Sequence, residues 1–199
     1  MKHAKRLTAA ALAGLISAMT LASGMTAYAA TGWQQNGSTY YYYDANGELH
    51  KGWLNTENGY YYLNLSTGKM TVGWEKINNK WYYFQGNGVM ATGWVKDNGK
   101  YYYLLTDGTM HTGWVSIDNV FYYLSDSGAM ATGWVNMDNG WYYFDPNDGK
   151  CTVDLAREIN DSWYMFGKDG KMLTGWQQID GKNYYFNQEK DGTAGQMRT

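Results

Sequence analysis

The sequence predicts an all-β fold, a solenoid (superhelix) of stacked β-hairpin repeats of about 20 residues each. The first supporting observation is a recurring Gly-Trp dipeptide, found at 32–33, 52–53, 73–74, 93–94, 113–114, 133–134 and 175–176. The second is an Asn-Gly dipeptide between aromatic runs, which is the strongest short-range signal for a hairpin. The third is an aromatic content of 18% beside a mean hydropathy of −0.58, because disordered chains are poor in aromatic residues.

The first 29 residues are expected to form a secretory signal peptide. Lys2, Lys5 and Arg6 precede a short apolar segment, and Ala27-Tyr28-Ala29 matches the small-x-small pattern of a cleavage site. Thr, Ser and Gly interrupt the apolar segment, whereas a transmembrane helix needs roughly 20 mostly apolar residues. We therefore expect cleavage after Ala29, a secreted protein, and a repeat array over 30–199.

The charge of the chain excludes two classes of partner. Cleavage would remove three basic residues and no acidic one, which changes the formal net charge from −2 to −5. Such a chain lacks the basic surface with which proteins bind nucleic acids or anionic membranes. We expect no nucleic-acid partner and, after cleavage, no membrane partner. The single cysteine, Cys151, excludes an intrachain disulfide.

Other positions repeat in step with the tryptophans. An aromatic residue stands seven positions after most of them, and a Met or Leu stands four positions before. The array comprises about eight units. The seventh, between 134 and 175, is degenerate because it lacks Gly-Trp.

Each unit is expected to form a hairpin and a connecting loop, as 93–110 illustrates. Asp97-Asn98-Gly99 lies between two runs of aromatic and β-branched residues, and Asn-Gly accepts the positive φ of a type I′ turn. Thr106-Asp107-Gly108 predicts the turn toward the next unit. Because an isolated hairpin is marginally stable in water, stacking on neighbours is expected to bury one face.

Strand alternation assigns residues to the two faces of a hairpin. In the segment 81–84, Tyr82 and Phe84 share one face, while Trp81 and Tyr83 share the other. The fourth position is Phe or Leu in every clear unit, which predicts that its face forms the core. The opposite face would hold large rings nearer to solvent.

These outer rings predict a series of aromatic sites for a cation or a sugar. Each site combines the Trp of Gly-Trp, the first aromatic residue of the same hairpin and a Tyr of the following hairpin. The predicted sets are Trp53, Tyr60 and Tyr83; Trp74, Trp81 and Tyr103; Trp94, Tyr101 and Tyr123; Trp114, Phe121 and Tyr143; and, as part of a further site, Trp134 and Trp141. A ring attracts a quaternary ammonium by about 0.5–2 kcal/mol, so single sites are weak and several on one array gain avidity. Alternatively, the rings only join the hairpins.

No arrangement of residues predicts catalysis or a metal site. Asp107 and Asp126 lie in turn segments, where the side chain bonds to the local backbone. His50 and His111 each stand three residues before a Trp and are expected to be exposed in loops. Cys151 stands where other units carry Met, so we expect a buried replacement for Met rather than a nucleophile. The sequence thus predicts a protein that is not an enzyme and uses no cofactor.

The motif VGWEKINNKWYYFQGNGVM at 72–90 resembles the choline-binding or cell-wall-binding repeat of Gram-positive surface proteins. The resemblance extends over about 31–199. It implies a superhelix of stacked hairpins that holds the choline of teichoic acids in aromatic cages between consecutive repeats. By position, the cages are the sets given above, together with Trp33, Tyr40 and Tyr62. Similar repeats occur in glucan-binding regions of glucosyltransferases and in the oligosaccharide-binding ends of clostridial toxins.

Departures from the family pattern predict damaged cages beyond residue 150. Leu155 stands where the seventh unit is expected to carry its Trp, and Met165 takes the third place of the aromatic run. Asn183 replaces a ring in the last unit. The best cages are therefore expected between 53 and 143.

Two functions are consistent with these patterns. The first is a secreted, cell-wall-associated protein without catalytic activity, whose partner is choline-substituted teichoic acid. The alternative is a protein that binds glucan or another wall glycan by stacking the same rings on sugar faces, because related folds serve different ligands.

Overall fold

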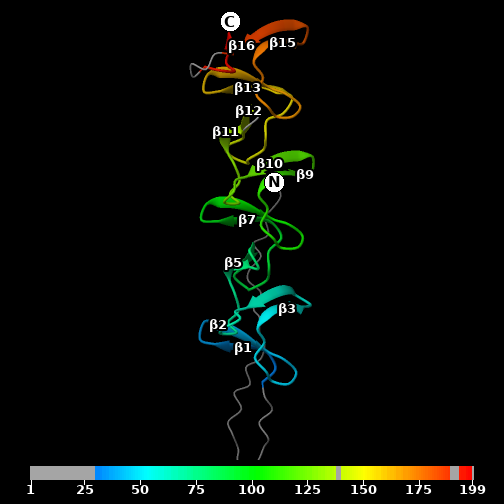
Figure 1. Cartoon of the computed structure of the whole chain (residues 1–199), viewed down its shortest axis with the longest axis vertical. Coiled ribbons are helices and arrows are strands. Elements are labelled where there is room, and N and C mark those ends of the chain that lie inside the picture. Colours follow the sequence, from blue (N-terminus) through cyan, green and yellow to red (C-terminus); the bar gives the residue numbers. More distant parts are fainter. Residues whose placement is uncertain (1–29, 138–139, 189–192, 199) are drawn as a thin grey trace, which may run out of the picture. The chain divides into compact units, whose positions relative to one another are not determined.

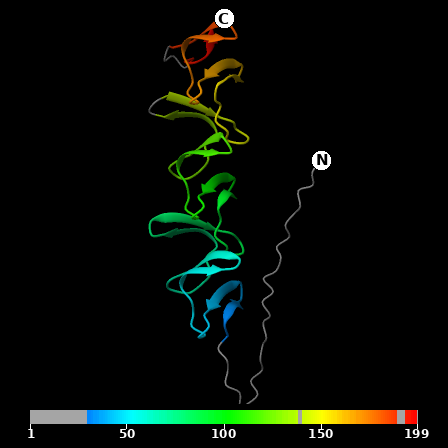
Figure 2. The same cartoon turned by 90° about the vertical axis from the view of Figure 1, so that its right-hand side faces the viewer.

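The structure, a computed structural model, describes residues 30–137, 140–188 and 193–198, so the predicted signal peptide at 1–29 lies outside the described residues. The chain divides into two units between Ala91 and Thr92. Figure 1 and Figure 2 show that both units are built from short hairpins and connecting loops. No helix that could span a membrane occurs in the part of the chain that the structure describes.

The strands pair as consecutive antiparallel hairpins, which confirms the all-β hairpin array. The first unit contains β1 (Gly32–Asn36), β2 (Thr39–Tyr43), β3 (Gly52–Thr56), β4 (Gly59–Leu63), β5 (Gly73–Ile77) and β6 (Lys80–Phe84). The second unit contains β7 (Gly93–Asp97), β8 (Lys100–Leu104), β9 (Gly113–Ile117), β10 (Val120–Leu124), β11 (Gly133–Met137), β12 (Gly140–Phe144), β13 (Leu155–Ile159), β14 (Ser162–Phe166), β15 (Gly175–Ile179), β16 (Lys182–Phe186) and β17 (Met197–Arg198).

The predicted turns are confirmed in the repeat 93–110. Asn98 and Gly99 have φ values of 46° and 79°, so both residues of the β7–β8 turn are left-handed, as a type I′ turn requires. Gly108 has a φ of 81° and donates its backbone N–H to the carbonyl of Leu105. Asp107 accepts hydrogen bonds from the backbone N–H and the hydroxyl of Thr109, which is the local bonding expected of a turn aspartate.

The loop after each hairpin joins it to the hairpin before. In the first unit, the backbone N–H of Met70 donates to the carbonyl of Tyr40 at 2.8 Å, and that of Thr71 donates to Tyr62 at 2.9 Å. In the second unit, Met130 and Ala131 donate in the same way to Tyr101 and Tyr123. Backbone hydrogen bonds therefore fix the spacing of consecutive hairpins within each unit.

The core lies at the fourth position of each aromatic run, as predicted. Phe84, Leu104, Leu124 and Phe144 are all 0–1% exposed. The ring of Phe144 packs against Trp114 of the preceding hairpin at a centroid distance of 5.5 Å.

The prediction that each hairpin buries one face and leaves the other nearer to solvent is wrong. Tyr142 and Tyr143 lie on opposite faces of β12, yet they are only 4% and 8% exposed. The reason is that the hairpin β11–β12 lies between two others, so each face packs against a neighbour. The face that carries Trp receives the Tyr82-type ring of the following hairpin, which therefore belongs both to the packing and to the candidate site.

The seventh hairpin keeps the strand register but shifts the predicted tryptophan position by one residue. Ala156 pairs with Met165 as Trp134 pairs with Tyr143, while Leu155 occupies the place of the usual glycine. The expectation that Leu155 replaces the Trp is therefore wrong, and the replacement is Ala156. The connection after Cys151 is one residue longer than after Met130, and the register of β13 and β14 absorbs the difference.

Candidate functional site: aromatic cages between hairpins

A cavity of about 320 Å³ lies between the hairpins β7–β8 and β9–β10. Its lining residues are Trp94, Tyr101, Tyr122, Met130, Asn147 and Asp148. The rings of Trp94 and Tyr122 are 5.0 Å apart and inclined at 69°. Because the rings meet edge to face, ring faces as well as edges line the cavity, and faces carry the negative end of the quadrupole.

A second cavity of about 240 Å³ repeats this arrangement one hairpin further on. Its lining residues are Trp114, Phe121, Tyr142, Cys151, Val153, Lys168 and Asp169. Trp114 and Tyr142 are 5.1 Å apart at 66°, almost the geometry of Trp94 and Tyr122. Both cavities are near the lower end of the roughly 300–1,000 Å³ typical of ligand pockets, which suits a small head group.

All three ring positions come together at one more junction, and two of them do so in the first unit. Trp134 lies 6.3 Å from Trp141 and 4.8 Å from Tyr164 of the next hairpin. In the first unit, Trp53 lies 5.0 Å from Tyr82, and Trp33 lies 4.8 Å from Tyr61.

The third ring of the predicted sets is wrong, because the following hairpin supplies its second aromatic residue rather than its third. The structure places Tyr82, Tyr122 and Tyr142 where Tyr83, Tyr123 and Tyr143 were predicted, and Tyr61 in place of Tyr62. The third rings lie instead against the Trp of their own hairpin: Tyr62 on Trp53, Tyr83 on Trp74, Tyr103 on Trp94, Tyr123 on Trp114 and Tyr143 on Trp134.

The corrected groupings keep most of the predicted residues together. The structure brings together Trp94, Tyr101 and Tyr122; Trp114, Phe121 and Tyr142; and Trp134, Trp141 and Tyr164. In the first unit it brings Trp53 against Tyr82 and Trp33 against Tyr61, and the membership of Tyr60 and Tyr40 in these two sites stays a prediction. The predicted set of Trp74, Trp81 and Tyr103 takes its residues from both units and stays a prediction. Within its own hairpin, Trp74 lies 6.5 Å from Trp81.

Side chains around the cages set their local charge. The ammonium of Lys96 lies 5.0 Å from the ring centroid of Tyr101, which shows that a cation is accommodated beside this ring. Asp148 and Asp169 add carboxylates to the walls of the two cavities. Burial, with a smaller contribution from Asp169, raises the pKa of the Cys151 thiol to about 11. This thiol is protonated at neutral pH and a poor nucleophile, in line with its expected role in place of Met.

Some contributing residues were missed or misjudged from the sequence. Asn147, Asp148, Lys168 and Asp169 belong to turns two hairpins beyond the Trp whose cavity they line. A 20-residue period does not indicate which turn lies beside which hairpin. His50 and His111 are half-buried rather than exposed, and Nε2 of each donates to the carbonyl of Trp53 or Trp114.

The described residues contain no cluster of three or more His, Cys, Asp or Glu side chains that could hold a metal ion. Hairpins that repeat one three-ring arrangement at successive junctions define a ligand-binding repeat module.

The comparison with protein families identifies the module. The choline-binding repeat matches residues 71–111, 111–154 and 156–196, and a putative cell wall binding repeat matches residues 31–49. These matches cover more than half of the chain. The chain belongs to the choline-binding repeat family.

Solved structures from Streptococcus pneumoniae have the same fold. CbpJ is 35% identical, with a TM-score of 0.76, and choline binding protein F, solved in the presence of a peptidoglycan analogue, is 35% identical, with a TM-score of 0.74. Each alignment covers 85% of this chain and 58% of the relative. The choline-binding domain of CbpL is 29% identical over 85% of this chain and 87% of that domain, with a TM-score of 0.61. Among curated protein sequences, none matches the chain.

Proposed function

We propose that this chain is a secreted, non-catalytic cell-wall-binding protein that holds choline residues of teichoic acids in the cages between consecutive hairpins. The observation that carries the proposal is the recurrence of one ring arrangement around a cavity, at Trp94 and again at Trp114. The family membership supports the same ligand.

The rings account for a weak, multivalent grip. Three ring faces contribute roughly 0.5–2 kcal/mol each to holding a quaternary ammonium, which gives a site in the millimolar range. Several such sites on one array, meeting a polymer that repeats its choline, gain about 10²–10⁴ in avidity. An acidic chain is compatible with this binding, because the protein binds the cation of the polymer rather than its phosphate.

Sugar binding on the same repeats is the alternative to choline binding. A sugar stacks best on an open, flat ring face, whereas Trp94 and Tyr122 meet at 69° and enclose a corner. The inclined arrangement favours a compact head group that contacts several ring faces at once. The described residues consist of repeats, which supports a binding role without catalysis.

The proposal is tested on a resin that carries an immobilised choline analogue. We expect the protein to be retained, to be released by free choline, and to remain bound in salt alone, because salt does not occupy the cages. Tyr101→Ser removes one cavity wall and is expected to lower the choline concentration needed for elution by a factor of about two to five. Leu105→Ser, an exposed change in the same unit that lines neither cavity, is the matched control and should elute like the wild type.

Two results would contradict the proposal. One is a folded protein that passes through the resin and is instead retained on immobilised glucan. The other is that both variants elute at the same choline concentration and that salt alone releases the wild type, because that pattern indicates simple ion exchange.

A further inference from the structure

The last described hairpin, β15–β16, leaves the tryptophan face of a junction uncovered. Trp176 takes in β15 the position that Trp134 takes in β11. Trp134 lies against Tyr164 and Phe166 of the next hairpin, at 4.8 and 5.7 Å between ring centroids. Trp176 is 72% exposed, against 39% for Trp114 at an inner junction. The strand β17 pairs with the edge of β16 and does not cover this ring.

The first hairpin, β1–β2, carries the rings that cover such a tryptophan. Tyr41 and Tyr43 take in β2 the positions that Tyr164 and Phe166 take in β14. They lie on the face opposite to Trp33, because residues alternate between the faces of a strand. Phe166 is fully buried, whereas Tyr41 and Tyr43 are half-buried, since no described hairpin precedes β1–β2.

The polar residue on this face of β1–β2 is compatible with stacking. Gln34 pairs with Tyr41, at a position where β9 and β11 carry valine. Gln177 has the same position in β15, a strand whose hairpin follows β13–β14, and it is half-buried there. In both strands Nε2 donates to the backbone carbonyl three residues earlier, Thr31 at 3.1 Å and Thr174 at 3.0 Å. The amide of Gln34 therefore keeps its hydrogen bond when the face is covered.

A backbone hydrogen bond of the usual junction is also missing at both of these hairpins. At inner junctions, the loop after one hairpin donates an N–H to the first residue of the aromatic run before it, as Met172 does to the carbonyl of Trp141 at 2.8 Å. After β1–β2 the corresponding donor is Leu49, whose N–H has no backbone acceptor among the described residues. In β16 the corresponding acceptor is the carbonyl of Asn183, to which no loop N–H donates in the described part of the chain. One hairpin thus lacks the acceptor and the other the donor.

We propose that the first hairpin of one copy of this chain stacks on the last hairpin of a second copy, so that Tyr41 and Tyr43 cover Trp176. The contact repeats the junction between consecutive hairpins, and Leu49 of one copy donates to Asn183 of the other. It is heterologous, because each copy contributes two different faces. A single hairpin face is small beside a stable protein interface, so the association is weak and reversible. The inference goes beyond the proposed function and does not rest on choline.

Analytical ultracentrifugation of the chain 30–199 tests the contact. The average mass of the wild type is expected to rise between about 1 μM and about 1 mM. Trp176→Ser and Tyr41→Ser should each weaken self-association about tenfold or more, because aromatic rings at the centre of a contact contribute most to binding. Mixed in equal amounts, the two variants should form pairs with one copy of each, since the first keeps an intact β1–β2 and the second an intact β15–β16. The mass of the mixture should stop at two copies.

Leu65→Ser and Leu155→Ser are the matched controls, because these side chains are 63% and 55% exposed and lie outside both faces. They should associate as the wild type does, and circular dichroism checks that every variant is folded. Three results would overturn the inference. The wild type stays monomeric up to about 1 mM; the leucine variants lose association as well, which indicates general apolar adhesion; or Tyr41→Ser associates like the wild type while Trp176→Ser does not, which indicates a symmetric contact. Retention on the choline resin is measured separately, so either proposal can fail without the other.

Discussion

The sixth and seventh hairpins share their packing but differ in their binding residues. Phe144 and Phe166 end the two second strands and are both fully buried. The first strands differ at the position that faces the next hairpin, where β11 carries Trp134 and β13 carries Ala156. The seventh hairpin remains paired and stacked without its Trp. Stacking therefore persists where the fourth residue is kept and the Trp is lost, whereas a three-ring cage requires the Trp.

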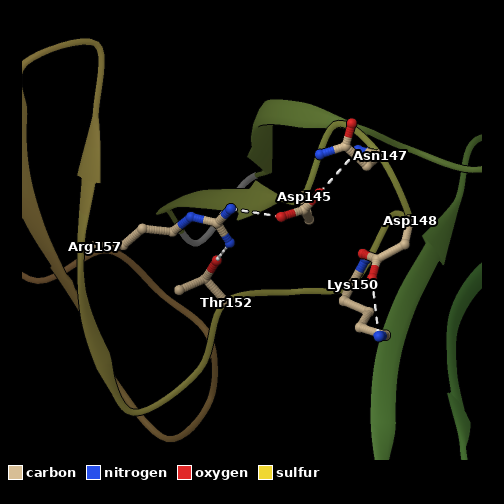
Figure 3. A network of polar contacts seen from close by, with 6 residues as sticks. All are labelled: Asp145, Asn147, Asp148, Lys150, Thr152 and Arg157. Carbon is tan, nitrogen blue, oxygen red and sulfur yellow. Dashed lines mark hydrogen bonds and ion pairs between the residues drawn. The ribbon is translucent and has the colours of Figure 1, made fainter.

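An additional polar contact holds the junction between these two hairpins. Arg157 lies on the face of β13 that packs against β12, and its Cζ is 5.1 Å from the ring centroid of Tyr143. Its Nη2 donates to Oδ2 of Asp145 at 2.5 Å and its Nη1 donates to Oγ1 of Thr152 at 3.2 Å (Figure 3). Corresponding positions in β9 and β11 carry Val115 and Val135, so this junction adds a cation to an otherwise apolar contact.

The largest expected effect is the difference in stability loss between replacing a covered tryptophan and replacing an exposed one. Trp134→Ala removes a ring that packs on Tyr143, Tyr164 and Phe166, and is expected to lower the free energy of unfolding by about 2–4 kcal/mol. Trp176→Ala is expected to change it by no more than about 0.5 kcal/mol, because that side chain is 72% exposed. Denaturant titration monitored by circular dichroism measures both.

Equal losses in the two variants would show that tryptophans stabilise their own hairpins rather than the junctions. In that case the contacts of Trp134 with Tyr164 and Phe166 of the next hairpin would contribute little to stability.

The next prediction concerns the pH dependence of the junction at Arg157. Hydrogen bonding to Arg157, followed by the backbone N–H of Asn147, lowers the pKa of Asp145 from 3.8 to about 2. A lowered pKa stabilises the folded state above the unfolded value, and that stability is lost as pH falls through the folded value. We expect the wild type to lose about 1–2 kcal/mol between pH 4 and pH 2, allowing for partial exposure of the pair.

Asp145→Asn should lack this loss while keeping the acid dependence of the rest of the protein. Asp148→Asn removes an exposed ion pair to Lys150 and is the matched control, expected to behave as the wild type does. Parallel curves for Asp145→Asn and the wild type between pH 4 and pH 2 would contradict the role given to Arg157.

The sequence predicted the hairpins, their turns and the buried fourth position because these depend on residues within one unit. The turn at Asn98-Gly99 depends only on the backbone of these two residues, and the burial of Phe84 follows from the alternation along its own strand. The third ring of each cage depends on the next hairpin. Alternation alone placed Tyr122 in a core and Tyr123 in the site, because it could not indicate that both faces of a hairpin are covered.

Counting residues also failed where the connection changes length. A constant spacing placed the missing Trp at Leu155, whereas strand pairing places it at Ala156. The register follows the buried Phe166 and Ile159, so burial decides which residue takes the Trp position. The rim residues of the cavities come from turns two hairpins away, and only the structure brings them together.

The smallest expected effect tests whether the seventh hairpin lacks a cage for want of one ring. Trp163 occupies the first ring position and is 43% exposed, and Tyr184 occupies in β16 the position that Tyr142 has in β12. Ala156→Trp is therefore expected to add one choline site of millimolar affinity, measured as an increase in the choline bound per chain in equilibrium dialysis. Ala156→Leu adds apolar bulk without a flat ring face, so it should leave the amount bound unchanged. An equal increase in both variants would show that bulk at the junction, rather than a third ring face, makes a cage.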